Sequence, residues 1–168
     1  MNAKSENDRN PTTVERKSER ELVIRRTFNA PARIVFEAWT KPELIMRWWT
    51  PKSYDTSFVS CEADVRTGGT YRFVFRGAGF GQPMAFFGRY IEVVPNARLV
   101  WTNDEGGEGG AVTTVTFEER GGETLVVMHD VYPSKEAANE AASGAARGFI
   151  ETFGQLDELL ATLGAGRS

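Results

Sequence analysis

The sequence is poor in the residues that build metal sites and disulfides. It has one cysteine, Cys61, and one histidine, His129, among 168 residues. A lone cysteine excludes an internal disulfide and a cysteine-built metal site, and a lone histidine excludes a His-rich one. We therefore expect neither a metal nor a cofactor. The single thiol also fits a reducing compartment.

Long apolar runs and an excess of positive charge are missing as well. No stretch of about 18 apolar residues occurs, which argues against a membrane span. Lys4 and Arg9 are not followed by an apolar segment, so we expect no signal peptide. The formal net charge is -3 and no basic block appears, which argues against general nucleic-acid binding. These absences favour a soluble cytoplasmic protein whose partners are neither nucleic acid nor membrane.

The composition changes sharply near residue 20. Residues 1–19 mix charges with Asn, Ser and Thr, and Val14 is the only sizeable apolar residue after Met1. Such a segment has little to bury, so we expect a flexible N-terminal tail. Residues 20–164 then form a single domain, and residues 165–168 a short C-terminal tail.

Within the domain, the apolar period changes twice. A β pattern over residues 21–29 is followed by two short helical segments, which begin near Pro31 and Pro42. Strand-like runs joined by Gly or Asn turns come next, which is typical of an antiparallel meander. We predict six of them, at residues 56–65, 70–76, 84–94, 98–103, 111–118 and 123–131.

The chain ends in a predicted long helix with two different halves. Ser134 is a suitable N-cap. Phe149, Phe153, Leu156, Leu160 and Leu163 then form one apolar stripe at helical spacing. The first half of the helix is built mostly from Ala, Gly and Ser, which either let the helix approach the sheet closely or leave space beneath it.

This order of elements predicts an α+β protein in which a curved antiparallel sheet grips a long helix. About seven antiparallel strands, in the order β-α-α-β6-α, would curve around the long C-terminal helix, because one helix cannot cover both faces of so wide a sheet. The two short helices would close one end of this arrangement.

Four stretches make the chain resemble a known family. They are Phe28-Asn29-Ala30-Pro31, Ala38-Trp39-Thr40 to Trp48-Trp49-Thr50-Pro51, Asp64-Val65-Arg66-Thr67-Gly68-Gly69-Thr70-Tyr71 and Gly88-Arg89-Tyr90-Ile91-Glu92-Val93-Val94-Pro95. The chain resembles small bacterial members of the family of activators of the heat-shock-protein-90 ATPase, in the START-related helix-grip superfamily. The resemblance implies a cavity between sheet and last helix for an apolar or amphipathic small molecule. It carries no catalytic residue over, and Phe149 stands where relatives often have Trp.

Three of the four tryptophans lie close together, at Trp39, Trp48 and Trp49. They either plug the core where the short helices meet the sheet or line a pocket, and core packing is the simpler interpretation. Adjacent helical residues point about 100° apart, so at most one of Trp48 and Trp49 looks straight into a cavity.

The candidate ligand-binding residues are mostly aromatic side chains at strand or helix spacing. Core packing alone would also explain such residues, but their density is consistent with a deep apolar cavity. The predicted cavity lining is Trp39, Trp48, Phe73, Phe75, Tyr90, Trp101, Phe117, His129, Phe149 and Phe153.

The polar candidates are weaker. His129 shares a strand face with Leu125 and Val127, and would be a polar anchor or an acid/base group if that face is concave. Otherwise it simply pairs with a neighbour. Glu62 and Asp64 fit a solvated strand face. The glycine-rich run at residues 106–110 lacks the features of a phosphate-binding loop and predicts a hairpin loop, at the mouth of the cavity.

Three functions remain open at this stage. The first is a binding module that encloses a hydrophobic or amphipathic small molecule. The second, which the resemblance implies, is a cyclase-, dehydratase- or hydrolase-like enzyme that would pair His129 with Tyr90 or Tyr71 in the same cavity. The third, taken from the family name alone, is an Hsp90-type chaperone co-factor. The sequence names no ligand and no reaction, and it leaves a homodimer open.

Overall fold

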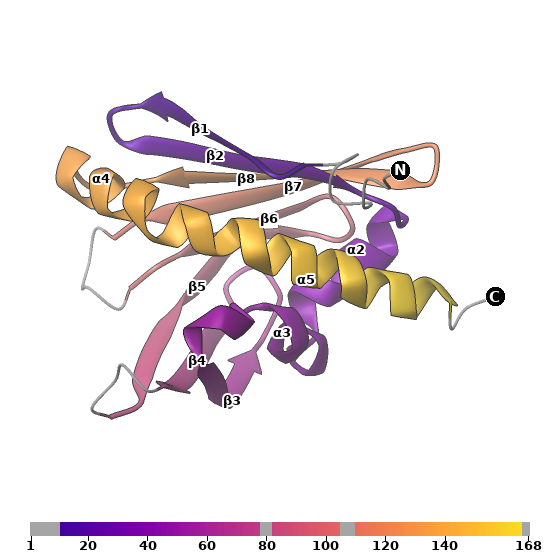
Figure 1. Ribbon diagram of the computed structural model, residues 1–168, viewed down its shortest axis with the longest axis horizontal. Helices are drawn as coiled ribbons and strands as arrows, with labels where there is room; N and C mark the ends of the chain where they lie inside the picture. The colour runs from indigo at the N-terminus through magenta and orange to yellow at the C-terminus, as the bar shows by residue number, and fades with distance from the viewer. Residues whose placement is uncertain (1–10, 78–81, 105–109, 166–168) are drawn as a thin grey trace.

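The computed structural model describes residues 11–77, 82–104 and 110–165, without the side chains of residues 145–147 and 164–165. It is an α+β protein in which a curved antiparallel sheet packs against the C-terminal helices (Figure 1). The strands are β1 (Thr13–Ser18), β2 (Glu21–Phe28), β3 (Thr56–Ala63), β4 (Thr70–Gly77), β5 (Met84–Val94), β6 (Arg98–Thr102), β7 (Val112–Arg120) and β8 (Glu123–Val131). The helices are α2 (Ala32–Thr40), α3 (Pro42–Trp48), the 3-10 turn η1 (Lys52–Tyr54), α4 (Lys135–Ser143) and α5 (Ala145–Ala165).

All described strands belong to one sheet in the order β1-β2-β8-β7-β6-β5-β4-β3. From β3 to β8 each strand pairs with the next, so the predicted meander is confirmed. β2 then pairs with β8, which brings the start of the domain next to its last strand. The predicted helix-grip arrangement is therefore correct, with eight strands instead of about seven.

The additional strand, β1, lies in the segment that the sequence predicts as a flexible tail. Thr13–Ser18 pairs with β2, and every residue of β1 is exposed. Main-chain hydrogen bonds to β2 hold β1 at the edge of the sheet. Because none of its side chains is buried, the sequence of β1 shows no alternation of apolar and polar residues. The tail prediction is wrong for this segment. Residues 1–10 and 166–168 lie outside the described residues, and Ala165 of the predicted C-terminal tail ends α5.

The predicted C-terminal helix is divided in two at Gly144. Ser134 caps α4 as expected, because its Oγ accepts a hydrogen bond from the Ala137 N–H at 3.1 Å. Gly144 then takes non-helical angles, φ -123° and ψ -74°, and α5 starts at the next residue. Glycine is a poor helix former because its backbone loses the most freedom on ordering. The break at Gly144 ends α4, and α5 then crosses the sheet (Figure 1).

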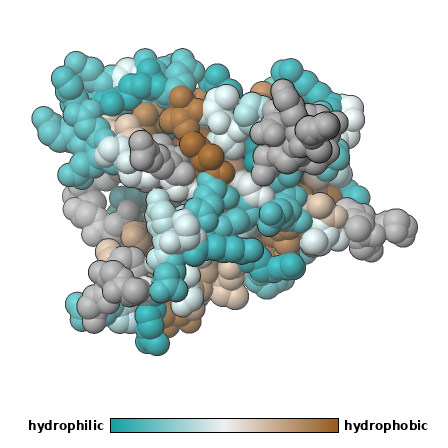
Figure 2. Space-filling model, viewed as in Figure 1, coloured by the Kyte–Doolittle hydropathy of each residue, from teal (hydrophilic) through white to brown (hydrophobic). Residues whose placement is uncertain are grey.

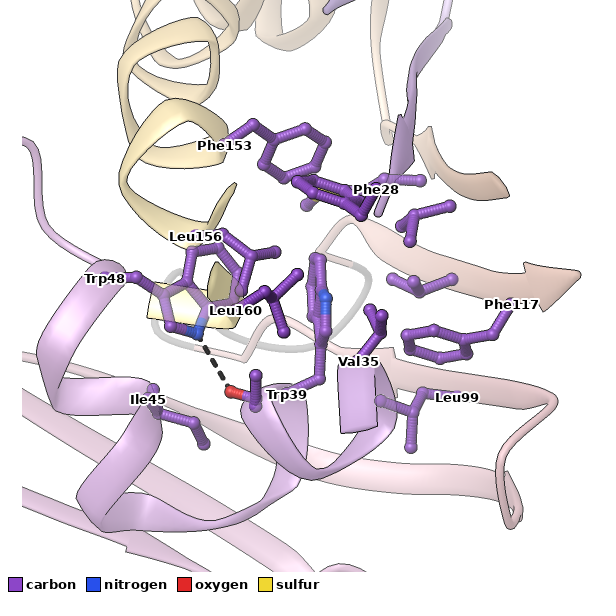
Figure 3. Close-up of a cluster of buried hydrophobic side chains, with 14 of the residues drawn as sticks. Phe28, Val35, Trp39, Ile45, Trp48, Leu99, Phe117, Phe153, Leu156 and Leu160 are labelled. Atoms are coloured by element: carbon purple, nitrogen blue, oxygen red, sulfur yellow. Dashed lines mark hydrogen bonds between the residues drawn. The ribbon is translucent and has the colours of Figure 1, made fainter. Parts of the chain in front are cut away.

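The core lies between α5 and the concave face of the sheet. Along β8 the buried residues are Thr124, Val126, Met128 and Asp130, which alternate with less buried ones. Phe153, Leu156 and Leu160 of α5 point at this face, among the side chains of α2 (Figure 3). The opposite side of α5 is polar: hydrophilic residues dominate the face of the molecule that carries it, with smaller apolar areas between them (Figure 2).

Candidate functional site

A cavity of about 380 Å³ lies at the β3–β5 end of the domain, between the sheet, the first turns of α5 and the segment that joins α3 to β3. Its volume falls within the range of about 300–1,000 Å³ that is typical of small-molecule sites. It opens beside the hydrophobic core and shares side chains with it, since Trp39, Tyr71 and Trp101 belong to the buried cluster and also line the cavity.

The sheet contributes an aromatic wall. Tyr71, Phe73 and Phe75 alternate along β4, so all three point to the concave side. The neighbouring strands and their ends add further lining residues, namely Thr56, Phe86, Tyr90, Trp101 and Asn103. This wall therefore consists largely of ring faces and edges.

The helical wall is formed by residues of α2, α3, α5 and the α3–β3 connection. Its lining residues are Trp39, Ile45, Trp49, Thr50, Pro51, Tyr54, Gly148, Phe149 and Thr152. A Cβ atom at Gly148 would lie 3.4 Å from the Tyr54 hydroxyl and 3.6 Å from Pro51, which are ordinary contact distances. Alanine would therefore fit at this position, whereas a larger side chain would meet the connection or enter the cavity.

Hydrogen bonds from α5 hold that connection in place. Buried Gln155 donates through Nε2 to the carbonyl oxygens of Trp48 and Thr50, at 3.0 and 2.9 Å, and accepts from the Lys52 N–H at 2.9 Å. One turn earlier, Glu151 accepts from the Ser53 N–H at 3.0 Å and from its hydroxyl at 2.5 Å. These bonds from Ser53 lower the pKa of the Glu151 carboxyl. These hydrogen bonds from α5 therefore fix the position of the α3–β3 connection, which forms part of the helical wall.

Six of the ten predicted lining residues lie in the walls of this cavity: Trp39, Phe73, Phe75, Tyr90, Trp101 and Phe149. Trp48, Phe117 and Phe153 do not, because they are packed into the adjacent core. Phe117 and Phe153 pack edge-on to Trp39, each at a centroid distance of 6.0 Å (Figure 3). Phe117 and Phe153, which were predicted to contact a ligand, thus contact Trp39 instead.

Trp48 lies in the core and Trp49 in the cavity wall. The prediction had placed Trp48, and not Trp49, in the cavity lining. Trp48 is completely buried, and its Nε1–H donates to the Ala38 carbonyl oxygen of α2 at 2.8 Å (Figure 3). Trp49 lines the cavity. The roughly 100° step between them was correctly expected to separate them, but only the packing of α3 on α2 decides which one faces inward.

His129 lies on the other face of the sheet. Its neighbours Met128 and Asp130 point to the helix side, so His129 points away from it. Its Nε2 lies 2.7 Å from Glu21 Oε1 on β2, and hydrogen bonds from Ser18 and then His129 lower the pKa of Glu21. The prediction of His129 as a cavity residue is therefore wrong, and it cannot act there with Tyr90 or Tyr71.

The sequence also missed several lining residues. Trp49 was considered only as part of the tryptophan cluster and Tyr71 only as an acid/base partner in the enzyme alternative, and neither was among the predicted lining residues. Asn103 ends the predicted strand at residues 98–103, on the face of Trp101, but a polar residue at a strand end gives no apolar signal, so its place in the cavity wall depends on how the strand ends fold. The exposed Glu62 and Asp64 form no acid/base pair, since Asp64 binds Arg66 at 2.9 Å. Residues 105–109 of the glycine-rich loop lie outside the described residues.

A hydrogen-bonded chain runs from the cavity wall into the sheet. The Tyr71 hydroxyl donates to the Thr102 carbonyl oxygen at 2.7 Å, and Asn103 Nδ2 donates to Thr113 Oγ1 at 3.2 Å. Thr113 in turn donates to Asp130 Oδ1 at 2.5 Å. Burial raises the pKa of Asp130, and it also raises the pKa of the Tyr90 hydroxyl, with a smaller effect from nearby Cys61. Tyr90 is therefore a neutral phenol at physiological pH.

Among the described residues there is no group of three or more His, Cys, Asp or Glu side chains that could hold a metal ion. Of the helices in the described part of the chain, none combines the length and apolar character that crossing a lipid bilayer requires.

Comparison of the sequence with models of known protein families shows to which family the chain belongs. The model of the family described as activator of Hsp90 ATPase homolog 1-like protein matches residues 29–161. The chain belongs to this family. The match spans both short helices, six strands of the sheet and nearly all of α5, and so includes every element that lines the cavity.

Several solved structures share the fold of this chain. A crystal structure of a protein from Rhodobacter sphaeroides has a TM-score of 0.81 at 26% identity, covering 90% of this chain and 99% of that one. A solution structure of a protein from Staphylococcus epidermidis has a TM-score of 0.73 at 27% identity, covering 89% and 94%. An AHSA1-like protein from Aeromonas hydrophila is similar in fold at 18% identity, with a TM-score of 0.69 and coverage of 83% and 93%. No functionally curated protein matches the chain.

Proposed function

We propose that this protein binds a hydrophobic or amphipathic small molecule in the cavity between the sheet and α5, and that it does so in the cytoplasm. The observation that supports the proposal most directly is a cavity of about 380 Å³ whose walls are largely aromatic. Apolar rings that face an open space bury more surface when a ligand fills it, which is the main source of affinity in sites of this kind.

The arrangement of the rings favours a flat ligand. Trp49 packs edge-on against Trp39, Phe73 and Phe149, with centroid distances of 5.9, 5.7 and 6.0 Å. It therefore connects the helical and sheet walls. An indole offers both a large apolar face and a donor N–H, so it can stack on a ring and orient it.

Filling the cavity with a side chain tests the proposal. Thr152 is buried and lines the cavity, so Thr152→Phe should occupy ligand space without a new charge. Ile150, on the same helix, is 52% exposed, and Ile150→Phe is the matched control. We expect naphthalene-based probes to quench the fluorescence of Trp39, Trp49 and Trp101 in the wild type and in the control, but at least about tenfold more weakly in Thr152→Phe.

Native mass spectrometry of the protein as purified is a second test, because a cavity of this type often retains its ligand. Equal probe binding by wild type and Thr152→Phe would contradict the proposal, since the probe would then bind elsewhere.

The two other functions receive less support. An enzyme that uses this cavity would have to work without His129, which lies on the opposite face of the sheet. A role as an Hsp90-type chaperone co-factor rests on the family description alone and stays a prediction, which stoichiometric binding to the bacterial chaperone would test.

A further inference from the structure

We propose that Asn103 makes the cavity prefer ligands that carry a hydrogen-bond donor, namely a hydroxyl or N–H group on a flat apolar body. This inference rests on the proposed function, because it assigns a polar contact within the same cavity. It is carried by the orientation of one amide, by the hydrogen bonds that hold it and by the aromatic surroundings of the site.

The hydrogen bonds of Asn103 determine which end of its amide remains available. Nδ2 lies 2.9 Å from the Ala111 carbonyl oxygen and 3.2 Å from Thr113 Oγ1. A carbonyl oxygen can only accept, so the group facing Ala111 must be the NH₂, and both of its protons are used. The remaining capacity of the Asn103 side chain is that of Oδ1, which is an acceptor.

Oδ1 has lone-pair capacity to spare. The contact to it from the Tyr71 hydroxyl is long, at 3.5 Å, and the same hydroxyl donates to the Thr102 carbonyl oxygen at the much better distance of 2.7 Å. A carbonyl oxygen can accept two hydrogen bonds. A ligand that brings a donor would therefore meet an acceptor that is not saturated.

The amide is also held rigidly. Thr113 accepts from Asn103 and donates to Asp130, and Asp130 accepts from the Tyr132 hydroxyl at 3.2 Å through its second oxygen. The backbone N–H of Asn103 bonds the Ala111 carbonyl oxygen at 3.0 Å as well. Little side-chain freedom is left to lose on binding, which is the condition under which one hydrogen bond contributes most to selectivity.

The aromatic surroundings allow Asn103 Oδ1 to distinguish ligands that carry a donor from ligands that carry only an acceptor. Trp101 and Tyr71 line the cavity beside the half-buried Asn103, and once a ligand displaces water from these rings, an acceptor with spare capacity is costly to leave unsatisfied. A ligand carboxylate or ether oxygen would place a second acceptor against Oδ1, whereas a hydroxyl would satisfy it. We therefore expect donors to be preferred over ethers of the same shape, and both over anions.

Three probes with one ring system test this directly: naphthol, methoxynaphthalene and naphthoate, all substituted at the same ring position. Tryptophan quenching gives the Kd of each at neutral pH. In the wild type, we expect naphthol to bind about three- to tenfold more tightly than methoxynaphthalene, the usual value of one net hydrogen bond, and naphthoate to bind most weakly.

Variants assign the preference to Asn103. In Asn103→Leu, naphthol and methoxynaphthalene should bind equally well. Thr113→Val leaves the amide in place but removes its support, so part of the preference should be lost. Asn139→Leu makes the same substitution at an exposed asparagine of α4, outside the cavity, and is the matched control in which the preference should persist. If Asn103→Leu does not fold, the side-chain amide signals of Asn103 in the wild type should shift with naphthol and not with methoxynaphthalene.

Two results would overturn the inference while leaving the proposed function intact. One is equal binding of naphthol and methoxynaphthalene by the wild type. The other is a preference for naphthol that survives in Asn103→Leu or disappears in Asn139→Leu. If the wild type binds none of the three probes, the proposed function fails and the inference fails with it.

Discussion

The indole Nε1–H of Trp48 donates a hydrogen bond to the carbonyl oxygen of Ala38, at 2.8 Å, across the junction between α3 and α2. This bond caps a carbonyl near the end of α2 that has lost its intrahelical partner. It also locks Trp48 into the core, and the next residue, Trp49, is left to line the cavity. The two residues therefore make different contributions, which substitutions can separate.

Trp48→Phe should destabilise the fold without changing the cavity wall. The substitution removes the hydrogen bond to Ala38 and leaves unfilled volume in a fully buried site, at a cost of about 2–4 kcal/mol in the free energy of unfolding. Urea denaturation measures this cost. Trp49→Phe, at a half-buried ring, should cost only about 1 kcal/mol but weaken probe binding. A larger loss of stability in Trp49→Phe would contradict this division.

Gln155→Leu should loosen the helical wall of the cavity. It removes the partners of the Trp48 and Thr50 carbonyl oxygens and of the Lys52 N–H, and part of the loss is recovered by water at the exposed Lys52. We expect a loss of about 2–3 kcal/mol in stability and faster dissociation of a bound probe in stopped-flow quenching. Glu158→Ala, at an exposed site on the same helix, should change neither quantity. Unchanged dissociation in Gln155→Leu would show that the connection does not control access.

Gly88→Ala should be strongly destabilising because β5 and β6 approach closely there. A Cβ atom at this position would lie 2.0 Å from the Thr102 carbonyl oxygen, which is backbone and cannot move aside. We expect a loss of at least about 3 kcal/mol, or failure to fold. Gly144→Ala is the matched control: its Cβ would meet Glu140 O at 3.5 Å, and the effect should stay within about 1 kcal/mol. Thermal unfolding of both variants gives the comparison.

The bonds between Glu151 and Ser53 should make stability depend on acid pH. The pKa of Glu151 in the folded protein lies below its ordinary value of 4.5, chiefly because Ser53 donates to the carboxylate. The carboxylate therefore contributes its full stabilisation above about pH 4.5, and the contribution is lost as the pH falls through the lowered pKa. In Glu151→Gln this part of the pH dependence should disappear from chemical unfolding curves, because the variant lacks the contribution of the carboxylate already at pH 7. The variant should therefore be somewhat less stable than the wild type at pH 7, and the two should converge as the pH falls. An unchanged slope between pH 5 and 3 would show that the Ser53 contact is not maintained in solution.

Much of the fold follows from local patterns in the sequence. The Tyr71–Phe73–Phe75 alternation, the Gly and Asn turns and the stripe from Phe149 to Leu163 predict a meander with a helix across it, because the periods of two and 3.6 residues are properties of the backbone. β1 was missed for the same reason. A strand that is exposed on both faces leaves no apolar pattern and is held only by its pairing with β2.

The sequence alone also determined that the chain has a dense aromatic interior and that Trp48 and Trp49 cannot share one environment. Only the tertiary structure decided which of them faces the cavity, that His129 lies on the outer face beside Glu21, and that Asn103 reaches the cavity wall. Residue type and spacing fix the direction of a side chain relative to its own helix or strand. Whether that direction meets the core, a cavity or solvent depends on elements that are distant in the chain, here α2 against α3 and β6 against β7.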